Sequence, residues 1–473
     1  MKYFEKNVLF ADRTVAIDST GCLMTYGDMY EWADEIRDVV PKRSLVFSFC
    51  HNVVGSVAGY FGFLCNEIVP VLLDRHIEKE LALNLIEVYH PDFLYVPMEQ
   101  REDFGKFETV LESYEYCLLK TNFGVKHEMY PELGLLLTTS GSTGSPKFVR
   151  QSYANIQANA ESIVEYLQLD ETERPITTLP MNYTYGLSIV NSHLLVGATI
   201  LLTDHTLMEK GFWEFFKENR ATSFGGVPYT YEMLKKLRFF RMDLPSLRYM
   251  TQAGGKLSPE LHKEFAEYAM EHGKKMIVMY GQTEATARMA YLPAERSLEK
   301  YGSMGIAIPG GKFTLVDVNE QPITEPEITG ELIYEGPNVT LGYAQCAEDL
   351  AKGDERGGRL VTGDMAKMDA DGFFYIVGRK KRFLKIYGNR VNLDEVERML
   401  KSKFDTYDFA VAGRDDNLYV FVTVESEEIH TEIRHFLAEK TGLNPKAFTV
   451  KMIAEVPKNE AGKTLYSKLE ELY

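Results

Sequence analysis

The sequence predicts an α/β protein: a large N-terminal domain of parallel-type α/β sheets with a small β subdomain, followed by a small, mobile α+β domain. Three stretches carry this prediction. Residues 44–73 alternate buried strand patterns with glycine-containing helical patterns, which is typical of parallel βαβ units. Residues 302–342 contain short β-rich segments between glycine and proline turns. The last stretch, 383–473, alternates helical and strand patterns.

Composition and charge narrow the class of protein. The chain has 473 residues, 45% of them hydrophobic, and a formal charge of −17, which argues against a nucleic-acid surface or adhesion to anionic lipid. The N-terminal residues lack the apolar core of a signal peptide, and the sequence has no apolar run long enough for a membrane span. The five cysteines form no C-x-x-C pair and the ten histidines show no metal-ligand spacing. We therefore expect a cytoplasmic protein without a transition-metal site.

The stretch 133–150, LGLLLTTSGSTGSPKFVR, predicts a buried strand, a loop of small residues and then a helix capped by Ser152. Backbone N–H groups, hydroxyls and one lysine in such a loop can surround a phosphate. A loop of this composition is by itself most often a turn, and it lacks the spacing of a kinase-type P-loop. The candidate phosphate-binding residues are Thr139, Ser140, Gly141, Ser142, Thr143, Gly144 and Lys147.

The sequence TTSGSTGSPK closely resembles the signature of the AMP-forming adenylating enzymes. This superfamily includes acyl-CoA synthetases, adenylation domains of peptide synthetases, and luciferases. Further segments match this superfamily in the expected order. They are LPMNYTYGL (179–187), QAGGKLSPE (252–260), YGQTE (280–284), TGD (362–364) and PKNEAGK (457–463). With the capped helix expected at 25–36, the resemblance covers nearly the whole chain.

The resemblance implies an ATP site. Tyr280 would stack on the purine, Thr283 would reach the α-phosphate, and Glu284 would bind Mg²⁺ as an oxygen ligand. Asp364 would hold the ribose hydroxyls, with Arg379 as a second nucleotide contact. The remaining predicted nucleotide contacts are Gly254 and Gly255, in the turn under the adenine, and Gly281.

The same resemblance places the acyl pocket. Tyr183 would be the gating aromatic residue, and Gly225 and Gly226 would leave space for the acid, although such tyrosines are often only turn or core residues. Relatives that activate amino acids place a Phe-Asp pair in this region, where the present sequence has Asn182 and Tyr183 and no acidic residue. A buried ammonium group needs a carboxylate partner, so we expect a carboxylic acid without an α-amino group.

The predicted domains are residues 1–377, a hinge at 378–382 with Lys381 at its pivot, and residues 383–473. The resemblance assigns Lys385 and Gly388 to the side where the thiol approaches, and Arg390 to the leaving pyrophosphate. Lys463 would neutralise charge during adenylation.

The expected enzyme is an AMP-forming acid–thiol ligase. A carboxylate attacks Mg·ATP to give an acyl adenylate and pyrophosphate, and CoA then displaces AMP to form a thioester. One alternative thiol is the phosphopantetheine of an acyl-carrier protein. A nucleotide-binding protein without turnover is disfavoured, because it would not need Lys463. A luciferase-like oxidation, for which Lys385 would matter, has no other support.

Overall fold

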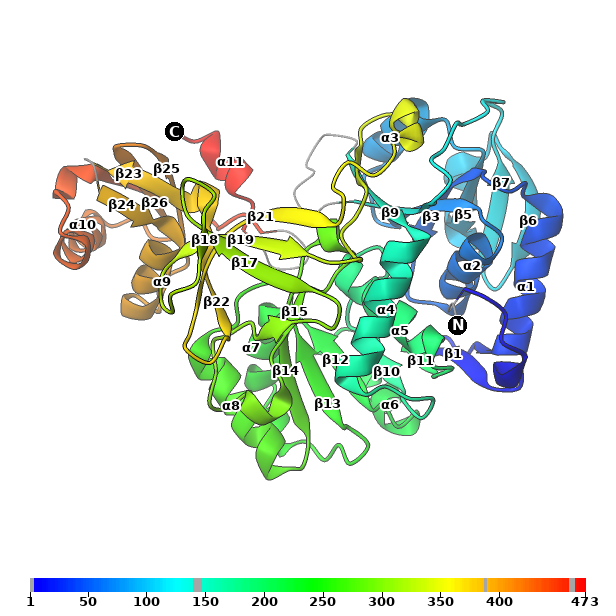
Figure 1. The fold of residues 1–473 in the computed structure, drawn as a ribbon, viewed down its shortest axis with the longest axis horizontal. Helices are drawn as coiled ribbons and strands as arrows, with labels where there is room; N and C mark the ends of the chain where they lie inside the picture. The colour runs from blue at the N-terminus through cyan, green and yellow to red at the C-terminus, as the bar shows by residue number, and fades with distance from the viewer. Residues whose placement is uncertain (1–3, 139–146, 387–388, 459–463) are drawn as a thin grey trace. The chain divides into compact units, whose positions relative to one another are not determined.

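The computed structural model describes residues 4–138, 147–386, 389–458 and 464–473 (Figure 1). The chain divides into two compact units. The first comprises Met1–Phe313 with Tyr334–Leu360, and the second comprises Thr314–Ile333 with Val361–Tyr473. Within the described residues, no helix has the length and apolar character that crossing a membrane requires.

An eight-stranded sheet in the first unit has the order β20-β9-β8-β4-β3-β5-β7-β6. Its centre is parallel, with β4 pairing both β3 and β8, as the βαβ pattern predicted. The strands are β3 (Leu45–Cys50), β4 (Val69–Asp74), β5 (Phe93–Pro97), β6 (Glu108–Ser113), β7 (Tyr116–Lys120), β8 (Leu133–Thr138), β9 (Phe148–Ser152) and β20 (Gly342–Ala344).

A nine-stranded sheet in the same unit has the order β16-β15-β14-β13-β12-β10-β11-β1-β2, with parallel pairing from β1 through β11, β10, β12 and β13 to β14. Its strands are β1 (Thr14–Asp18), β2 (Leu23–Thr25), β10 (Pro175–Ile176), β11 (Ile200–Leu202), β12 (Ser223–Gly226), β13 (Tyr249–Gln252), β14 (Lys275–Tyr280), β15 (Ala290–Tyr291) and β16 (Ile306–Ala307).

Helices of the first unit pack around these sheets. Helix α2 is buried over nearly its whole length, and its core cluster includes residues from strands of both sheets, such as Val46 and Ile200. The helices are α1 (Tyr26–Val39), α2 (Val54–Cys65), α3 (Lys79–Tyr89), α4 (Tyr153–Leu167), α5 (Thr184–Leu195), α6 (Lys210–Glu218), α7 (Pro228–Lys236) and α8 (Pro259–Glu271).

The second unit contains smaller sheets. A five-stranded sheet has the order β18-β17-β19-β21-β22, and its neighbouring strands β21 and β22 carry Asp364 and Arg379. The strands are β17 (Lys312–Val316), β18 (Pro322–Ile323), β19 (Gly330–Glu335), β21 (Arg359–Met368), β22 (Phe374–Arg379), β23 (Phe383–Ile386), β24 (Asn389–Asn392), β25 (Phe409–Arg414), β26 (Asn417–Val422) and β27 (Phe448–Met452). The helices are α9 (Leu393–Lys403), α10 (Glu427–Thr441) and α11 (Tyr466–Glu470).

The element order after β8 corrects one prediction. We expected strand, loop and helix in succession, but β9 lies between the loop and α4 and pairs antiparallel with β8. All five residues of β9 are buried, so both faces of the strand are covered and its sequence FVRQS shows no alternation of apolar and polar residues. Ser152 does cap α4, as predicted, by accepting a hydrogen bond from the Asn155 N–H. The helix N-terminus therefore does not follow directly from the small-residue loop.

Candidate active site

A tight loop after β14 positions two charged residues. A Cβ atom at Gly281 would lie 1.5 Å from the Ala287 carbonyl oxygen, so only glycine fits there. Ala287 has a φ of 119°, which is strained for a residue with a side chain. The loop closes where the Met289 N–H donates to the Tyr280 carbonyl at 2.9 Å. Glu284 and Arg288 both project from this short segment.

Hydrogen bonds from residues much later in the sequence hold Glu284 in place. The Tyr343 hydroxyl donates to Glu284 Oε1 at 2.7 Å, while Arg356 Nη1 donates to the Glu284 carbonyl at 2.9 Å. Within the described residues, Glu284 Oε2 accepts no hydrogen bond. One carboxylate oxygen is thus held in place and the other remains available, which suits a ligand to a hard cation such as Mg²⁺. Thr283 begins the same 3-10 turn and is half-buried.

Tyr343 is a site residue that the sequence analysis did not identify. Two cations flank its ring: Lys147 Nζ lies 3.5 Å and Arg356 Cζ lies 4.8 Å from the ring centroid. Burial and the neighbouring Glu284 carboxylate raise the pKa of Tyr343 to about 12, so the phenol stays protonated and donates. The only sequence signal was the Gly-Tyr pair at the end of GPNVTLGY (336–343).

The predicted gate and the predicted adenine turn meet. Gly254 has a φ of 82°, and a Cβ atom there would lie 2.5 Å from the Tyr183 hydroxyl. A Cβ atom at Gly225 would lie 2.9 Å from the Tyr185 hydroxyl, and one at Gly226 would lie 2.7 Å from a methyl group of its neighbour Thr230. These glycines therefore allow aromatic side chains to approach the ends of β12 and β13.

The remaining predicted contacts of the first unit lie in the same part of the chain. Gly255 follows Gly254, and a Cβ atom there would lie 3.0 Å from Pro228 Cγ. Tyr280 is half-buried at the end of β14, and its hydroxyl accepts a hydrogen bond from Gln282 at 3.2 Å. The loop residues Thr139, Ser140, Gly141, Ser142, Thr143 and Gly144 lie outside the described residues.

In the second unit, Asp364 and Arg379 form an ion pair. They are register partners in β21 and β22, and Arg379 Nε lies 2.9 Å from Asp364 Oδ1. The Asp364 side chain is 5% exposed and that of Arg379 57%. The two predicted nucleotide contacts of this unit are thus adjacent.

The residues predicted for the hinge and for the side where the thiol approaches come directly after Arg379 in the sequence. Lys381 is exposed in the 3-10 turn Lys380–Arg382, and Lys385 and Arg390 are register partners in the β23–β24 hairpin. Gly388 and Lys463 lie outside the described residues.

Tyr466 stands where the superfamily often has an arginine three residues after the terminal lysine. Its ring carries the Arg382 guanidinium at 3.9 Å, and its hydroxyl donates to Glu397 at 3.0 Å. The tyrosine therefore fastens α11 to the residue that follows Lys381.

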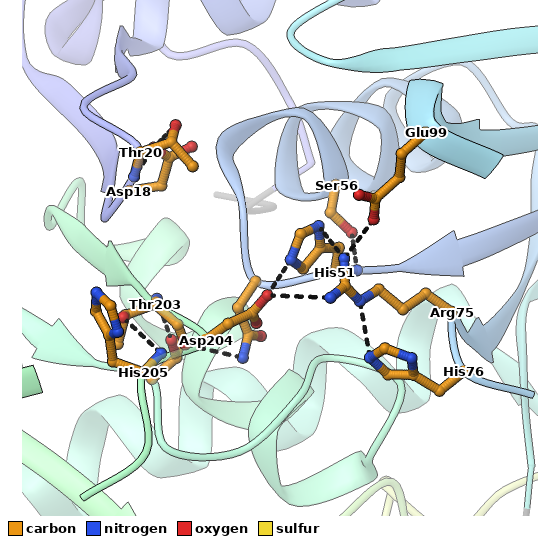
Figure 2. A network of polar contacts seen from close by, with 12 residues as sticks. Asp18, Thr20, His51, Ser56, Arg75, His76, Glu99, Thr203, Asp204 and His205 are labelled. Atoms are coloured by element: carbon orange, nitrogen blue, oxygen red, sulfur yellow. Dashed lines mark hydrogen bonds and ion pairs between the residues drawn. The ribbon is translucent and has the colours of Figure 1, made fainter. Parts of the chain in front are cut away.

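A polar network at the carboxyl ends of β3, β4 and β11 was also not predicted (Figure 2). His51 bonds Asp204 through Nε2, and its Nδ1 lies 3.2 Å from Arg75 Nη1. Arg75 also donates to Glu99 at 2.6 Å. Burial opposes ionisation of Asp204, but the His51 hydrogen bond and the charges of His51 and Arg75 lower its pKa. The network thus joins strands of the two sheets, and the charge of Arg75 is compensated by the carboxylates of Glu99 and Asp204.

Comparison with known proteins identifies the family of the chain and its fold. Residues 4–344 match the family described as AMP-binding enzyme. The chain is 27% identical over 98% of its length to 4-coumarate–CoA ligase-like 2 of Arabidopsis thaliana, of which 80% is covered. It is 28% identical over 85% of its length to a 2-succinylbenzoate–CoA ligase of Bacillus cereus, of which 83% is covered.

A solved structure shows the same fold. O-succinylbenzoate coenzyme A synthetase from Bacillus subtilis in complex with AMP superposes with a TM-score of 0.78 at 20% identity, covering 98% of this chain and 96% of that one. The chain belongs to the AMP-binding enzyme family, as its motifs predicted. It is an AMP-forming acid–thiol ligase of the acyl-CoA synthetase type.

Proposed function

We propose that this enzyme activates a carboxylic acid without an α-amino group with Mg·ATP and transfers the acyl group to CoA. The observation that carries the proposal is the Glu284 carboxylate, which Tyr343 holds by one oxygen while the other stays available. Similarity to ligases named for CoA supports CoA as the thiol in preference to a carrier protein. A cytoplasmic location remains part of the proposal, and the five free cysteines are consistent with it.

The chemistry requires charge compensation. The carboxylate that attacks the α-phosphorus and the triphosphate repel each other, so the site must offset negative charge as the new bond forms. Mg²⁺ bound with ATP would supply part of this compensation, and Glu284 fits as its protein ligand. Lys147, held over the Tyr343 ring, adds a cation from the chain itself.

Other residues keep the roles given by the resemblance. Thr283 would contact the α-phosphate, and Asp364, oriented by Arg379, would accept hydrogen bonds from the ribose. Lys463 would serve adenylation alone. No side chain acts as a nucleophile, because the substrate carboxylate and the thiol supply both nucleophiles.

The test replaces Glu284 with Gln. The amide oxygen can still accept the Tyr343 hydrogen bond, but the charge that attracts Mg²⁺ is lost. We expect acid-dependent ATP–pyrophosphate exchange to fall by about 10²- to 10³-fold, with partial recovery at high Mg²⁺ concentration. Glu299→Gln is the matched control, because this carboxylate is 60% exposed and its ion pairs within the described residues are with Arg296 and Lys300. Unchanged exchange in Glu284→Gln at every Mg²⁺ concentration would remove Glu284 from the site.

Mass spectrometry identifies the product. Reactions with a panel of carboxylic acids, each run with CoA, with a phosphopantetheinylated carrier protein and with neither, should yield an acyl-CoA. Acyl adenylate that accumulates with CoA but disappears with the carrier would instead identify a carrier-loading ligase.

A further inference from the structure

Arg288 is a buried cation that has no carboxylate partner among the described residues. The residue is only 2% exposed. Its Nε donates to Ser188 Oγ at 3.1 Å, and its Nη1 donates to the Tyr166 hydroxyl at 3.1 Å and to Met279 Sδ at 2.6 Å. Within the described part of the chain, Nη2 makes no hydrogen bond and no carboxylate forms an ion pair with the guanidinium.

The groups around Arg288 are neutral. Burial raises the pKa of Tyr166, and it raises the pKa of Tyr185 to about 12, so both phenols keep their protons at neutral pH. Burial, reinforced by the charge of Arg288, lowers the pKa of the neighbouring His193 to about 4. Arg288 lies over the Tyr185 ring with its Cζ 4.7 Å from the centroid. A cation–π contact offsets only part of the free-energy cost of burying an unpaired ion.

The backbone holds Arg288 in this position. The strained Ala287, with its φ of 119°, immediately precedes it. The Arg288 carbonyl accepts hydrogen bonds from the side-chain amides of Asn159 and Asn338, both at 2.9 Å. Strain and paired amide contacts that keep an uncompensated charge inside are typical of a binding site.

Arg150 shows what a structural buried arginine looks like in the same unit. It is 0% exposed, and it donates to the carbonyls of Leu341, Tyr343, Lys352 and Gly353. It also pairs with Glu355 at 2.5 Å. Every nitrogen of this guanidinium is satisfied, whereas that of Arg288 is not.

The charge of Arg288 borders the predicted acyl pocket. A cavity of about 10 Å³ is lined by residues that include Gly225, Thr251, Tyr249, His193 and Arg288. This volume suffices for about one water molecule. A larger group can therefore reach the guanidinium only if the surrounding side chains shift as the acid binds.

We propose that Arg288 binds a second carboxylate of the substrate, so that the acid activated by this enzyme is a dicarboxylic acid. One carboxylate reacts with ATP near Glu284, and the other, at the far end of the acyl group, pairs with Arg288. The inference rests on the proposed function and adds the chemical class of its acid. The second carboxylate of the substrate would supply the negative charge opposite Arg288 that no described residue supplies.

The experiment compares dicarboxylic acids with their mono-methyl esters, which keep the shape and one reactive carboxylate. The probes are linear α,ω-diacids of three to eight carbons and benzene-based diacids. In the wild type, the best diacid should exceed its half-ester by about 100-fold or more in kcat/KM for ATP–pyrophosphate exchange, because a half-ester leaves the buried cation unpaired. In Arg288→Met this preference should fall to about one or reverse, and Arg288→Lys should restore part of it. A wild type that prefers the half-esters, or a ratio unchanged in Arg288→Met, would overturn the proposal.

Folding is measured in parallel. Removing an unpaired buried charge should leave the melting temperature of ligand-free Arg288→Met equal to or above that of the wild type. Arg150→Met, the matched buried arginine, should melt lower. A marked loss of stability in Arg288→Met would show that Arg288 also supports the fold. The preference for diacids over half-esters is then compared between the wild type and Arg288→Lys.

Failure of the proposed function has a different signature. If the wild type exchanges pyrophosphate with monocarboxylic acids only, the ligase assignment stands and the diacid inference fails. If it exchanges with no acid, the proposed function fails. The inference is then decided by binding: a diacid should raise the melting temperature of the wild type and not that of Arg288→Met.

Discussion

His262 shows how one buried ring shapes the response of this protein to pH. The Gly302 N–H donates to its Nδ1 at 3.0 Å, so the proton of the neutral ring lies on Nε2, which donates to Ser297 Oγ at 2.9 Å. Both nitrogens are engaged only in this neutral tautomer. Burial accordingly lowers the pKa of His262 from 6.5 to about 4.

The direction of the pH effect follows from this pKa. Between pH 6.5 and about 4 the unfolded chain binds a proton at His262 that the folded chain does not bind, so stability falls as the pH falls through this window. The slope is at most about 1.4 kcal/mol per pH unit. We expect His262→Gln to show a shallower loss in urea unfolding between pH 7 and 4. His205→Gln, at a side chain 42% exposed, should follow the wild type. Identical slopes for wild type and His262→Gln would contradict the assignment.

At the scale of elements, strand β9 connects regions far apart in sequence. It pairs with β8 on one side and β20 on the other, and Arg150 reaches from it to four carbonyls between Leu341 and Gly353. Tyr343 lies in β20, so this arginine also supports the strand that holds Glu284.

Removing that support should destabilise the first unit. Arg150→Met removes four hydrogen bonds to backbone carbonyls and the ion pair with Glu355, and each lost hydrogen bond costs about 0.5–1.5 kcal/mol. We expect the free energy of unfolding to fall by about 3 kcal/mol or more, measured by urea denaturation. Arg37→Met is a suitable comparison, because that side chain is 53% exposed, its partners Asp34 and Asp38 are exposed as well, and its loss should change stability by less than about 1 kcal/mol. Equal effects of the two substitutions would show that the carbonyl contacts of Arg150 contribute little.

Local signals predicted many elements well. The capped helix expected at 25–36 is α1, with Thr25 and Asp28 forming a capping box. Helix α8 begins with comparable local signals, a Ser258 cap followed by Pro259. Strand β9 was missed because both of its faces are buried, and its pairing with β20 joins residues about 190 positions apart. Periodicity reports only local order, so such pairing leaves no pattern within the strand.

In the site, too, local motifs could be predicted from the sequence, whereas contacts between residues far apart in sequence could not. The motif at 280–284 identified Glu284, but its partner Tyr343 lies 59 residues away. Arg288 reads in the sequence as an ordinary basic residue of a loop, and only its burial and the neutral groups around it reveal its character. The roles assigned to Lys463 and to residues 139–144 remain predictions.

At the scale of the whole molecule, the chain passes between the two units more than once. Residues 314–333 belong to the second unit although segments of the first precede and follow them, so the chain changes unit after residues 313, 333 and 360. The five-stranded sheet joins strands from both sides of the last of these points, because β19 pairs with β21.

This connectivity decides what a protease could separate. A cut near residue 360 would break the chain, but hydrogen bonds between β19 and β21 would keep the fragments together on a native gel. Lys380 and Lys381 are exposed, and the residues beyond them have a core of their own between Leu384 and Phe448. Limited trypsin digestion should therefore release a folded C-terminal fragment that begins near Arg382, which is the predicted hinge. Early release of a fragment beginning near residue 361 would instead show that the separable piece is the larger unit.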